Sequence, residues 1–142
     1  MSLSSAAWAQ TVTAEKVPAQ VKRAFQTKFP DVKSVEWKIK SEKYEAEFTL
    51  KGAEVTVKFD ATGKWLETET QIASSELTPT VRDALAKRFK GYKIIETQTV
   101  QLYNDPKTIY EIHLKNDKEI LKTQLYADGT ILNQSAKPRK KN

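Results

Sequence analysis

"YEAEFTLKGAEVTVKFDATG" occupies residues 44–63, and a related stretch, "YEIHLKNDKEILKTQLYADG", occupies residues 110–129. In both stretches apolar residues alternate with polar ones on either side of a turn, and both stretches end at a glycine. Alternation with a period of two predicts strands that bury one face, so each stretch predicts an antiparallel hairpin. The repetition of the hairpin predicts a duplicated fold.

A helical pattern precedes each hairpin. Residues 17–29 and 77–89 align with each other and carry apolar residues at the spacings of one helical face, ending at Phe29 and Phe89. Thr78 stands where an N-cap residue would satisfy the first free amides of the second helix. We therefore expect two short amphipathic helices.

These patterns predict an α+β fold made of two tandem units, each with one helix followed by four antiparallel strands. We expect the first unit at residues 15–74 and the second at residues 75–135. A signal-peptide remnant or flexible N-terminus (residues 1–14) would precede them, and a basic C-terminal tail (residues 136–142) would follow. One helix on four strands offers little core, so we expect the units to share one extended sheet with both helices on one face.

The charge distribution argues against a nucleic-acid partner. The formal net charge of the 142 residues is +6, but the terminal segment contributes four positive charges, from Lys137, Arg139, Lys140 and Lys141. The rest of the chain is nearly balanced, and a short basic tail is typical of a solvated terminus. No apolar run approaches the roughly 20 residues that cross a bilayer, so we expect no membrane span.

The N-terminal sequence indicates export. In "SSAAWAQ" (residues 4–10), Ala7, Trp8 and Ala9 form the small-x-small pattern of a signal-peptidase site. The basic and apolar segments of a complete signal are missing, so we expect a remnant and a periplasmic or secreted location. The alternative is an alanine-rich terminus without such a role.

The duplicated helix, the alternating strands and the turn "VKFDATG" (residues 57–63) resemble the PepSY-like family of small exported bacterial proteins. The fold of that family is similar to that of β-lactamase-inhibitor protein, and the resemblance covers about residues 15–133. It implies the fold described above and a binding or inhibitory role. The inhibitor itself is disulfide-bonded, whereas this chain has no cysteine, so inhibition of a β-lactamase is not expected.

Residues typical of catalytic and metal sites are scarce. His113 is the only histidine, and its place between Ile112 and Leu114 puts it on the polar face of a strand, where we expect it to be solvated. Asp60 and Asp128 precede turns that contain glycine, where a carboxylate usually caps the backbone. The chain has no GxSxG motif and no glycine-rich phosphate loop. We therefore expect no enzyme, no catalytic residue, no cofactor and no bound metal.

The polar residues of the two hairpins predict a binding face on the side of the sheet opposite the helices, which we call the open face. A broad sheet face without covering helices can accept a loop of a partner protein, whereas the simpler alternative is an ordinary solvated sheet. Two aromatic residues in or near loops could anchor a partner. The predicted partner-binding residues are Lys38, Lys40, Glu45, Glu47, Lys58, Trp65, Tyr103, Glu111, His113, Lys122 and Tyr126.

The functional hypothesis from the sequence is a non-enzymatic exported module that binds or inhibits an envelope or extracellular protein through the open face. The alternative is a carrier of a small ligand or peptide, with a pocket between the two units.

Overall fold

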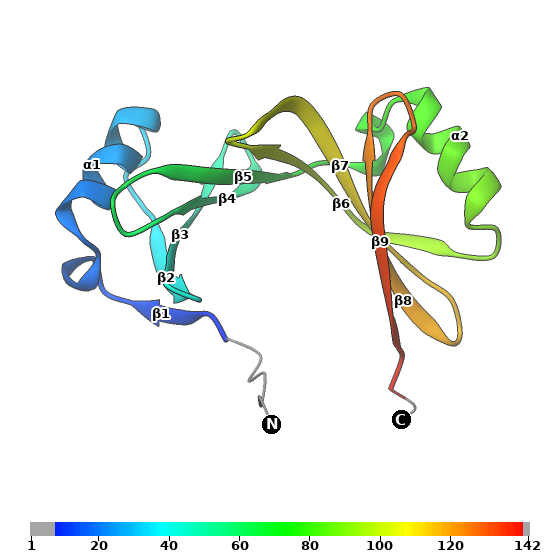
Figure 1. Cartoon of the computed structure of the whole chain (residues 1–142), viewed down its shortest axis with the longest axis horizontal. Coiled ribbons are helices and arrows are strands. Elements are labelled where there is room, and N and C mark those ends of the chain that lie inside the picture. Colours follow the sequence, from blue (N-terminus) through cyan, green and yellow to red (C-terminus); the bar gives the residue numbers. More distant parts are fainter. Residues whose placement is uncertain (1–7, 141–142) are drawn as a thin grey trace. The chain divides into compact units, whose positions relative to one another are not determined.

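The computed structural model of the chain describes residues 8–140. Within them, two helices accompany a nine-stranded antiparallel sheet, whose strands follow one another in chain order from β1 to β9 (Figure 1). The expected mixture of helices and antiparallel strands is confirmed. The expected signal-peptidase site begins at Ala7, which lies outside the described residues. Lys141 of the expected basic tail lies outside them as well.

The structure divides into two compact units, the first ending at Thr68 and the second beginning at Glu69. Each unit has its own cluster of buried apolar side chains. The limits that we expect for the repeats, residues 15–74 and 75–135, stay a prediction, as do the shared use of the sheet and the placement of both helices on one face.

The first unit contains helix α1 and the first strands of the sheet. Its elements are β1 (Gln10–Val12), a short 3-10 helix (Ala14–Lys16), α1 (Ala19–Lys28), β2 (Glu36–Lys40), β3 (Lys43–Leu50), β4 (Ala53–Phe59) and β5 (Trp65–Gln71), which continues into the second unit. The apolar face of α1 supplies Val21 and Phe25 to the core. The ring of Phe25 lies 5.4 Å from those of both Trp37 and Phe48, so aromatic packing joins the helix to β2 and β3.

Strand β1 departs from the expected N-terminal segment. Residues 10–12 lie within the range that we expected to be flexible or a signal remnant, but they pair antiparallel with β2, Gln10 opposite Ile39 and Val12 opposite Trp37. Val12 packs against the core of the first unit. Three residues are too few to show an alternating pattern, so the sequence carried no signal for this strand.

The second unit contains helix α2 and the remaining strands. Its elements are a short 3-10 helix (Ser74–Glu76), α2 (Pro79–Arg88), β6 (Lys93–Leu102), β7 (Asp105–Lys115), β8 (Glu119–Tyr126) and β9 (Ile131–Pro138). Val81 and Leu85 of α2 pack with Ile112 and Leu125 in the core of this unit. Thr78 is the N-cap, as predicted, because its Oγ1 accepts a hydrogen bond from the Val81 amide at 3.1 Å.

The expected basic tail begins inside a strand. Strand β9 runs to Pro138, and Lys137 lies opposite Ile120 of β8. Beyond the strand, the amide of Arg139 donates to the Lys118 carbonyl at 3.0 Å. All of β9 after Ile131 is exposed, so its sequence lacks the apolar alternation that marks a half-buried strand.

The two aspartate-containing turns are built as the sequence predicts. The Asp60 carboxylate accepts hydrogen bonds from the amides of Thr62 and Lys64 at 2.9 and 3.0 Å, and Asp128 accepts one from the Thr130 amide at 2.9 Å. Hydrogen bonds from Thr62 and Thr130 lower the pKa of Asp60 and Asp128, respectively. The expected capping role of both aspartates is confirmed.

Each of these turns also contacts the start of the helix in its own unit. In the first unit the side-chain amide of Gln20 donates to the Ala61 carbonyl at 3.0 Å. In the second unit the Thr78 hydroxyl donates to the Ala127 carbonyl at 3.0 Å. The repeat therefore preserves a contact between helix and turn that fixes each helix against its strands.

Candidate binding face

The strand register brings predicted residues together on the open face of the first unit. Glu45 of β3 lies opposite Lys38 of β2 on one side and Lys58 of β4 on the other. The next residue, Ala46, faces the core instead. A row of lysine, glutamate and lysine therefore crosses the centre of this face.

The two lysines of this row are held by ion pairs with other glutamates. The Nζ atom of Lys38 lies 3.0 Å from Oε2 of Glu47, and that of Lys58 lies 2.7 Å from Oε2 of Glu67. The hydrogen bond with Glu47 raises the pKa of Lys38, which stays charged. Glu45 itself is only 8% exposed, although we expected a solvated position. Lys40, at the end of β2, is exposed.

A buried carboxylate occupies the centre of the open face of the second unit. Glu111 of β7 is 4% exposed and lies opposite Gln98 of β6 and Gln124 of β8. Both side-chain amides donate to it, Gln98 to Oε2 and Gln124 to Oε1, the latter at 2.8 Å. The Nζ atom of Lys122 lies 3.4 Å from Oε1. Every oxygen of this carboxylate thus has a donor.

The electrostatics keep Glu111 ionised. Burial by itself would raise its pKa, but the hydrogen bond from Gln124, the charge of Lys122 and the hydrogen bond from Gln98 together outweigh it, and the net shift is downward. Because both oxygens of the ionised Glu111 carboxylate accept hydrogen bonds, Glu111 holds the side chains of Gln98 and Gln124 in one arrangement on the open face.

Glu45 and Glu111 occupy the same place in the two repeated stretches, each directly after the tyrosine that begins its stretch. Both are buried, but the first is flanked by two lysines and the second by two glutamines. Sequence reasoning found both glutamates through the repeat. It missed Gln98, because β6 lies outside the repeated stretch.

His113 corrects the expectation of a solvated histidine. It lies on the open face, as predicted, but its side chain is only 26% exposed. Its Nδ1 lies 3.6 Å from Oε2 of Glu96, and its Nε2 lies 3.5 Å from Oε2 of Glu111. Nε2 is buried and has no hydrogen-bond partner within residues 8–140. The ring thus has Glu96 of β6, Glu111 of β7 and, opposite it in the register, Lys122 of β8 as neighbours, which alternation alone could not predict.

The predicted aromatic anchors differ in their availability. Trp65 is half-buried, packs against the core of the first unit and donates from Nε1 to Oγ1 of Thr68 at 2.9 Å. The Nζ atom of Lys28 lies 4.2 Å from the centre of its ring. Tyr103, in the turn between β6 and β7, is 52% exposed. Of the two, Tyr103 offers more surface to a partner.

Tyr126, the last of the predicted residues, is tied to the β6–β7 hairpin. Its hydroxyl donates to Oδ2 of Asp105 at 2.6 Å, and this hydrogen bond raises the pKa of Tyr126. The Nζ atom of Lys107 lies 4.8 Å from the centre of its ring. The tyrosine is therefore held in place.

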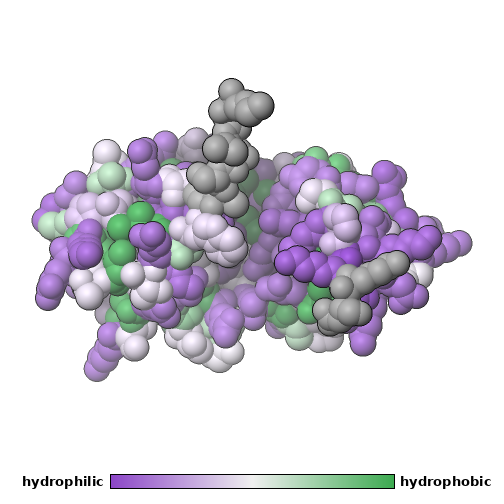
Figure 2. Space-filling view, turned by 90° about the horizontal axis from the view of Figure 1, so that it is seen from below, coloured by the Kyte–Doolittle hydropathy of each residue, from purple (hydrophilic) through white to green (hydrophobic). Residues whose placement is uncertain are grey.

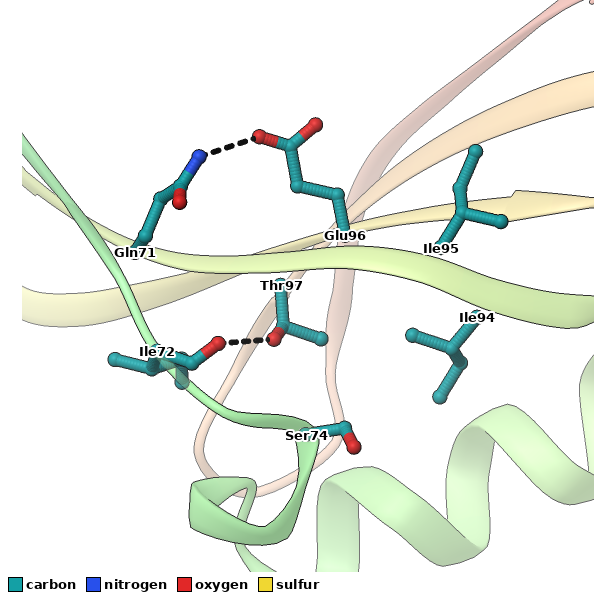
Figure 3. Close-up of a pocket in the computed structure, with 7 residues that line it drawn as sticks. All are labelled: Gln71, Ile72, Ser74, Ile94, Ile95, Glu96 and Thr97. Atoms are coloured by element: carbon teal, nitrogen blue, oxygen red, sulfur yellow. Dashed lines mark hydrogen bonds between the residues drawn. The ribbon is translucent and has the colours of Figure 1, made fainter. Parts of the chain in front are cut away.

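A cavity of about 450 Å³ lies beside the start of β6 (Figure 3). A β-bulge between Ile94 and Glu96 places Ile95 and Glu96 on the same side of the strand, where Ile95 is exposed. Gln71 donates to Glu96 at 3.1 Å, and the Thr97 hydroxyl donates to the Ile72 carbonyl at 2.6 Å. These polar groups bind one another, so the cavity offers few free donors or acceptors to a ligand.

The surface shown in Figure 2 is mostly hydrophilic, with smaller hydrophobic patches between the polar side chains. Within residues 8–140, no helix is long and apolar enough to cross a membrane. In the same part of the chain, no three histidine, cysteine, aspartate or glutamate side chains are grouped so that they could hold a metal ion.

Comparison with known proteins identifies one family whose model matches most of the chain. A family described as "Putative beta-lactamase-inhibitor-like, PepSY-like" matches residues 5–56 and 42–130. None of the curated proteins compared with the chain is a significant match.

Three solved structures illustrate the similarity of fold. A BLIP-like protein from Bacteroides fragilis has 25% sequence identity and a TM-score of 0.73, over 88% of this chain and 90% of that one. A DUF2874 family protein from Bacteroides uniformis has 22% identity and a TM-score of 0.79, over 84% and 88% of the two chains. A "putative periplasmic" protein from Bacteroides eggerthii has 20% identity and a TM-score of 0.79, over the same shares.

Proposed function

Because the chain belongs to the PepSY-like family, as its sequence resemblance indicated, we propose that it is an exported, non-enzymatic protein that binds or inhibits a protein of the cell envelope. The open face of the sheet is the binding surface. Two similar structures support this reading, since one is described as BLIP-like and another as periplasmic. The partner itself is a protein of the periplasm or of the cell exterior.

The observation that carries the proposal is the fixed polar pattern of the open face. In the first unit Lys38 is held by Glu47, and in the second Glu111 is held by Gln98 and Gln124. Side chains that are already ordered lose little conformational entropy when a partner binds. A polar surface of this kind favours specific recognition.

The same groups are poorly suited to acid–base catalysis. A general base that acts near neutral pH needs a pKa near the working pH, which for a glutamate requires an upward shift. The pKa of Glu111 is lowered instead, and its oxygens are occupied by donors. His113 lies between two carboxylates, and none of the described hydrogen bonds joins it to a nucleophilic side chain. These features support a binding role.

Lys40 provides the sharpest test, because it is exposed on the open face and its reversal breaks none of the ion pairs described above. We expect Lys40→Glu to weaken capture of the partner from envelope extract by about fivefold or more, since reversing a charge opposite a complementary partner costs over 1 kcal/mol. Quantitative pull-down with the tagged full chain, followed by titration of the captured protein, measures the effect.

Lys87→Glu is the matched control, because Lys87 is an exposed lysine on α2, away from the open face. It should leave capture within about twofold of the unchanged chain. Equal loss in both variants, or capture that neither variant affects, would contradict binding through the open face.

The small-ligand carrier stays an alternative prediction. It rests on a pocket between the units, whereas the cavity beside Ile95 lies within the second unit.

A further inference from the structure

A smaller cavity opens where β7, β8 and β9 lie side by side in the second unit. Its volume is about 260 Å³, and it is lined by His113, Ile120, Lys122, Ser135, Ala136 and Lys137. The register explains most of this set: His113, Lys122 and Ser135 form one row across the three strands, and Ile120 lies opposite Lys137 in the next. We call this cavity the β8 pocket.

The lining of the β8 pocket is cationic. Lys122 and Lys137 line it, and Lys115 is the other register neighbour of Ile120. No aspartate or glutamate is among the described lining residues. Lys137 forms no ion pair with any residue from 8 to 140, in contrast to Lys38 in the first unit. The pocket therefore keeps positive charge that the protein does not neutralise internally.

The carboxylate paired with Lys122 does not remove this charge. Glu111 lies 3.4 Å from Lys122, but it is buried and already accepts hydrogen bonds from Gln98 and Gln124. Glu96 lies 3.6 Å from Nδ1 of His113, but neither carboxylate forms a described ion pair with Lys137, and Nε2 of His113 has no hydrogen-bond partner in the described chain. An added anion would improve the balance of charge.

The shape and the remaining lining narrow the class of anion. Ile120 and Ala136 give the pocket apolar surface, and the Ser135 hydroxyl gives it a neutral donor. A short aliphatic chain that ends in a carboxylate matches this combination. Sites for whole small molecules usually exceed about 300 Å³, so 260 Å³ suits a single side chain better than a free metabolite.

We propose that the β8 pocket binds a carboxylate group of the protein partner, supplied by a glutamate or aspartate side chain or by a C-terminus. The methylene groups of the ligand lie on Ile120, and its oxygens accept from Lys137, Lys122 and Ser135. This inference rests on the proposed function, because it names the chemistry of the partner at the open face of the second unit.

The probe for this site is N-acetyl-L-glutamate α-methylamide, which carries a single side-chain carboxylate. Its glutamine analogue has the same shape without the charge. We expect the glutamate probe to cause saturable NMR shifts in the ¹⁵N-labelled full chain, centred on Ile120, Lys122, Ser135 and Lys137. It should bind at least about fivefold more tightly than the glutamine analogue.

Lys137→Met tests the contribution of the free lysine without disturbing Glu111. It should weaken binding of the glutamate probe by about fivefold, whereas Lys87→Met, which removes the same charge from α2, should change it by less than about twofold. Equal weakening by the two variants would mean attraction by net charge alone and would overturn the proposal. Equal binding of the two probes, or shifts elsewhere on the chain, would overturn it as well.

Inorganic phosphate separates the carboxylate from another anion. Phosphate that displaces the glutamate probe and binds more tightly would identify a phosphate site and refute the proposal. The proposed function fails separately, because its test depends on Lys40 in the first unit. A partner whose capture is weakened by Lys40→Glu but not by Lys137→Met would remove the carboxylate site and leave the open face in place.

Discussion

At the scale of the residue, Glu111 combines burial with ionisation, and its effect on stability should depend on pH. We expect Glu111→Gln to lower the free energy of unfolding at pH 7 by about 2 kcal/mol, because the variant loses charged hydrogen bonds to two glutamines and leaves Lys122 without its partner. Urea unfolding followed by circular dichroism measures this change.

The sign of the pH effect follows from the lowered pKa of Glu111. A carboxylate with a lowered pKa stabilises the folded state at pH values above its unfolded pKa of about 4.5, and loses that contribution as the pH falls through its folded pKa. The difference in the free energy of unfolding between the unchanged chain and the Glu111→Gln variant should therefore shrink below about pH 4.5. Glu54→Gln, at an exposed site on β4, is the control and should stay within about 0.5 kcal/mol at all pH values. A difference that persists at low pH would show that packing, rather than charge, explains the loss.

At the scale of the element, the contact between turn and helix should tolerate no extra atom. Gly63 has φ of +92°, and a Cβ atom there would lie 2.7 Å from the Gln20 carbonyl oxygen. Gly52 has φ of +81°, but a Cβ atom there would meet nothing within 4 Å. Gly52→Ala should therefore cost about 1 kcal/mol for its backbone conformation alone. Gly63→Ala should cost about 1–3 kcal/mol more, because the first turn of α1 must move.

Thermal and urea unfolding of both alanine variants provide the measurement. Equal destabilisation would mean that the turn and the helix move apart freely, and that the contact between Gln20 and Ala61 does not fix α1.

The elements also show how far the sequence could predict the fold and the face. Helices and hairpins were predictable because each buries one side, which leaves a period in the sequence; Phe48 and Ile112 are examples of residues that point inward as expected. Strand β1 was not, because three residues show no period. The fourth strand of the second unit was predicted, but β9 runs to Pro138, beyond the expected limit at residue 135, because an exposed edge strand has no apolar side to mark its end. The polar residues of the face were predictable by alternation, but their burial was not, because Glu111 is covered by Gln98 from a strand outside the repeat.

At the scale of the whole molecule, the separate cores raise the question of whether each unit folds alone. The core of the first unit contains Phe25 and Trp37, and that of the second contains Leu85 and Ile112, with no buried residue in common. Each unit is small, however, and a domain of about 60–70 residues buries only about 60% of the surface of its unfolded chain. Such a unit is marginal by itself.

Strand β5 is the reason why we expect the two units to unfold together. It runs from Trp65 to Gln71 and so contains the boundary between Thr68 and Glu69. Because one continuous strand belongs to both units, unfolding of either unit removes hydrogen-bonding partners from part of it. We therefore predict that the intact chain unfolds in one cooperative transition, and that fragments 10–74 and 75–142 are largely unfolded when expressed separately.

Differential scanning calorimetry of the chain and circular dichroism of the fragments provide the two measurements. A calorimetric enthalpy equal to the van't Hoff enthalpy would support one transition, whereas two resolved transitions, or one fragment with a cooperative melt, would establish independent units. In that case the carboxylate site of the second unit could still act alone, but a partner that also requires Lys40 would have to bridge two separately folding units.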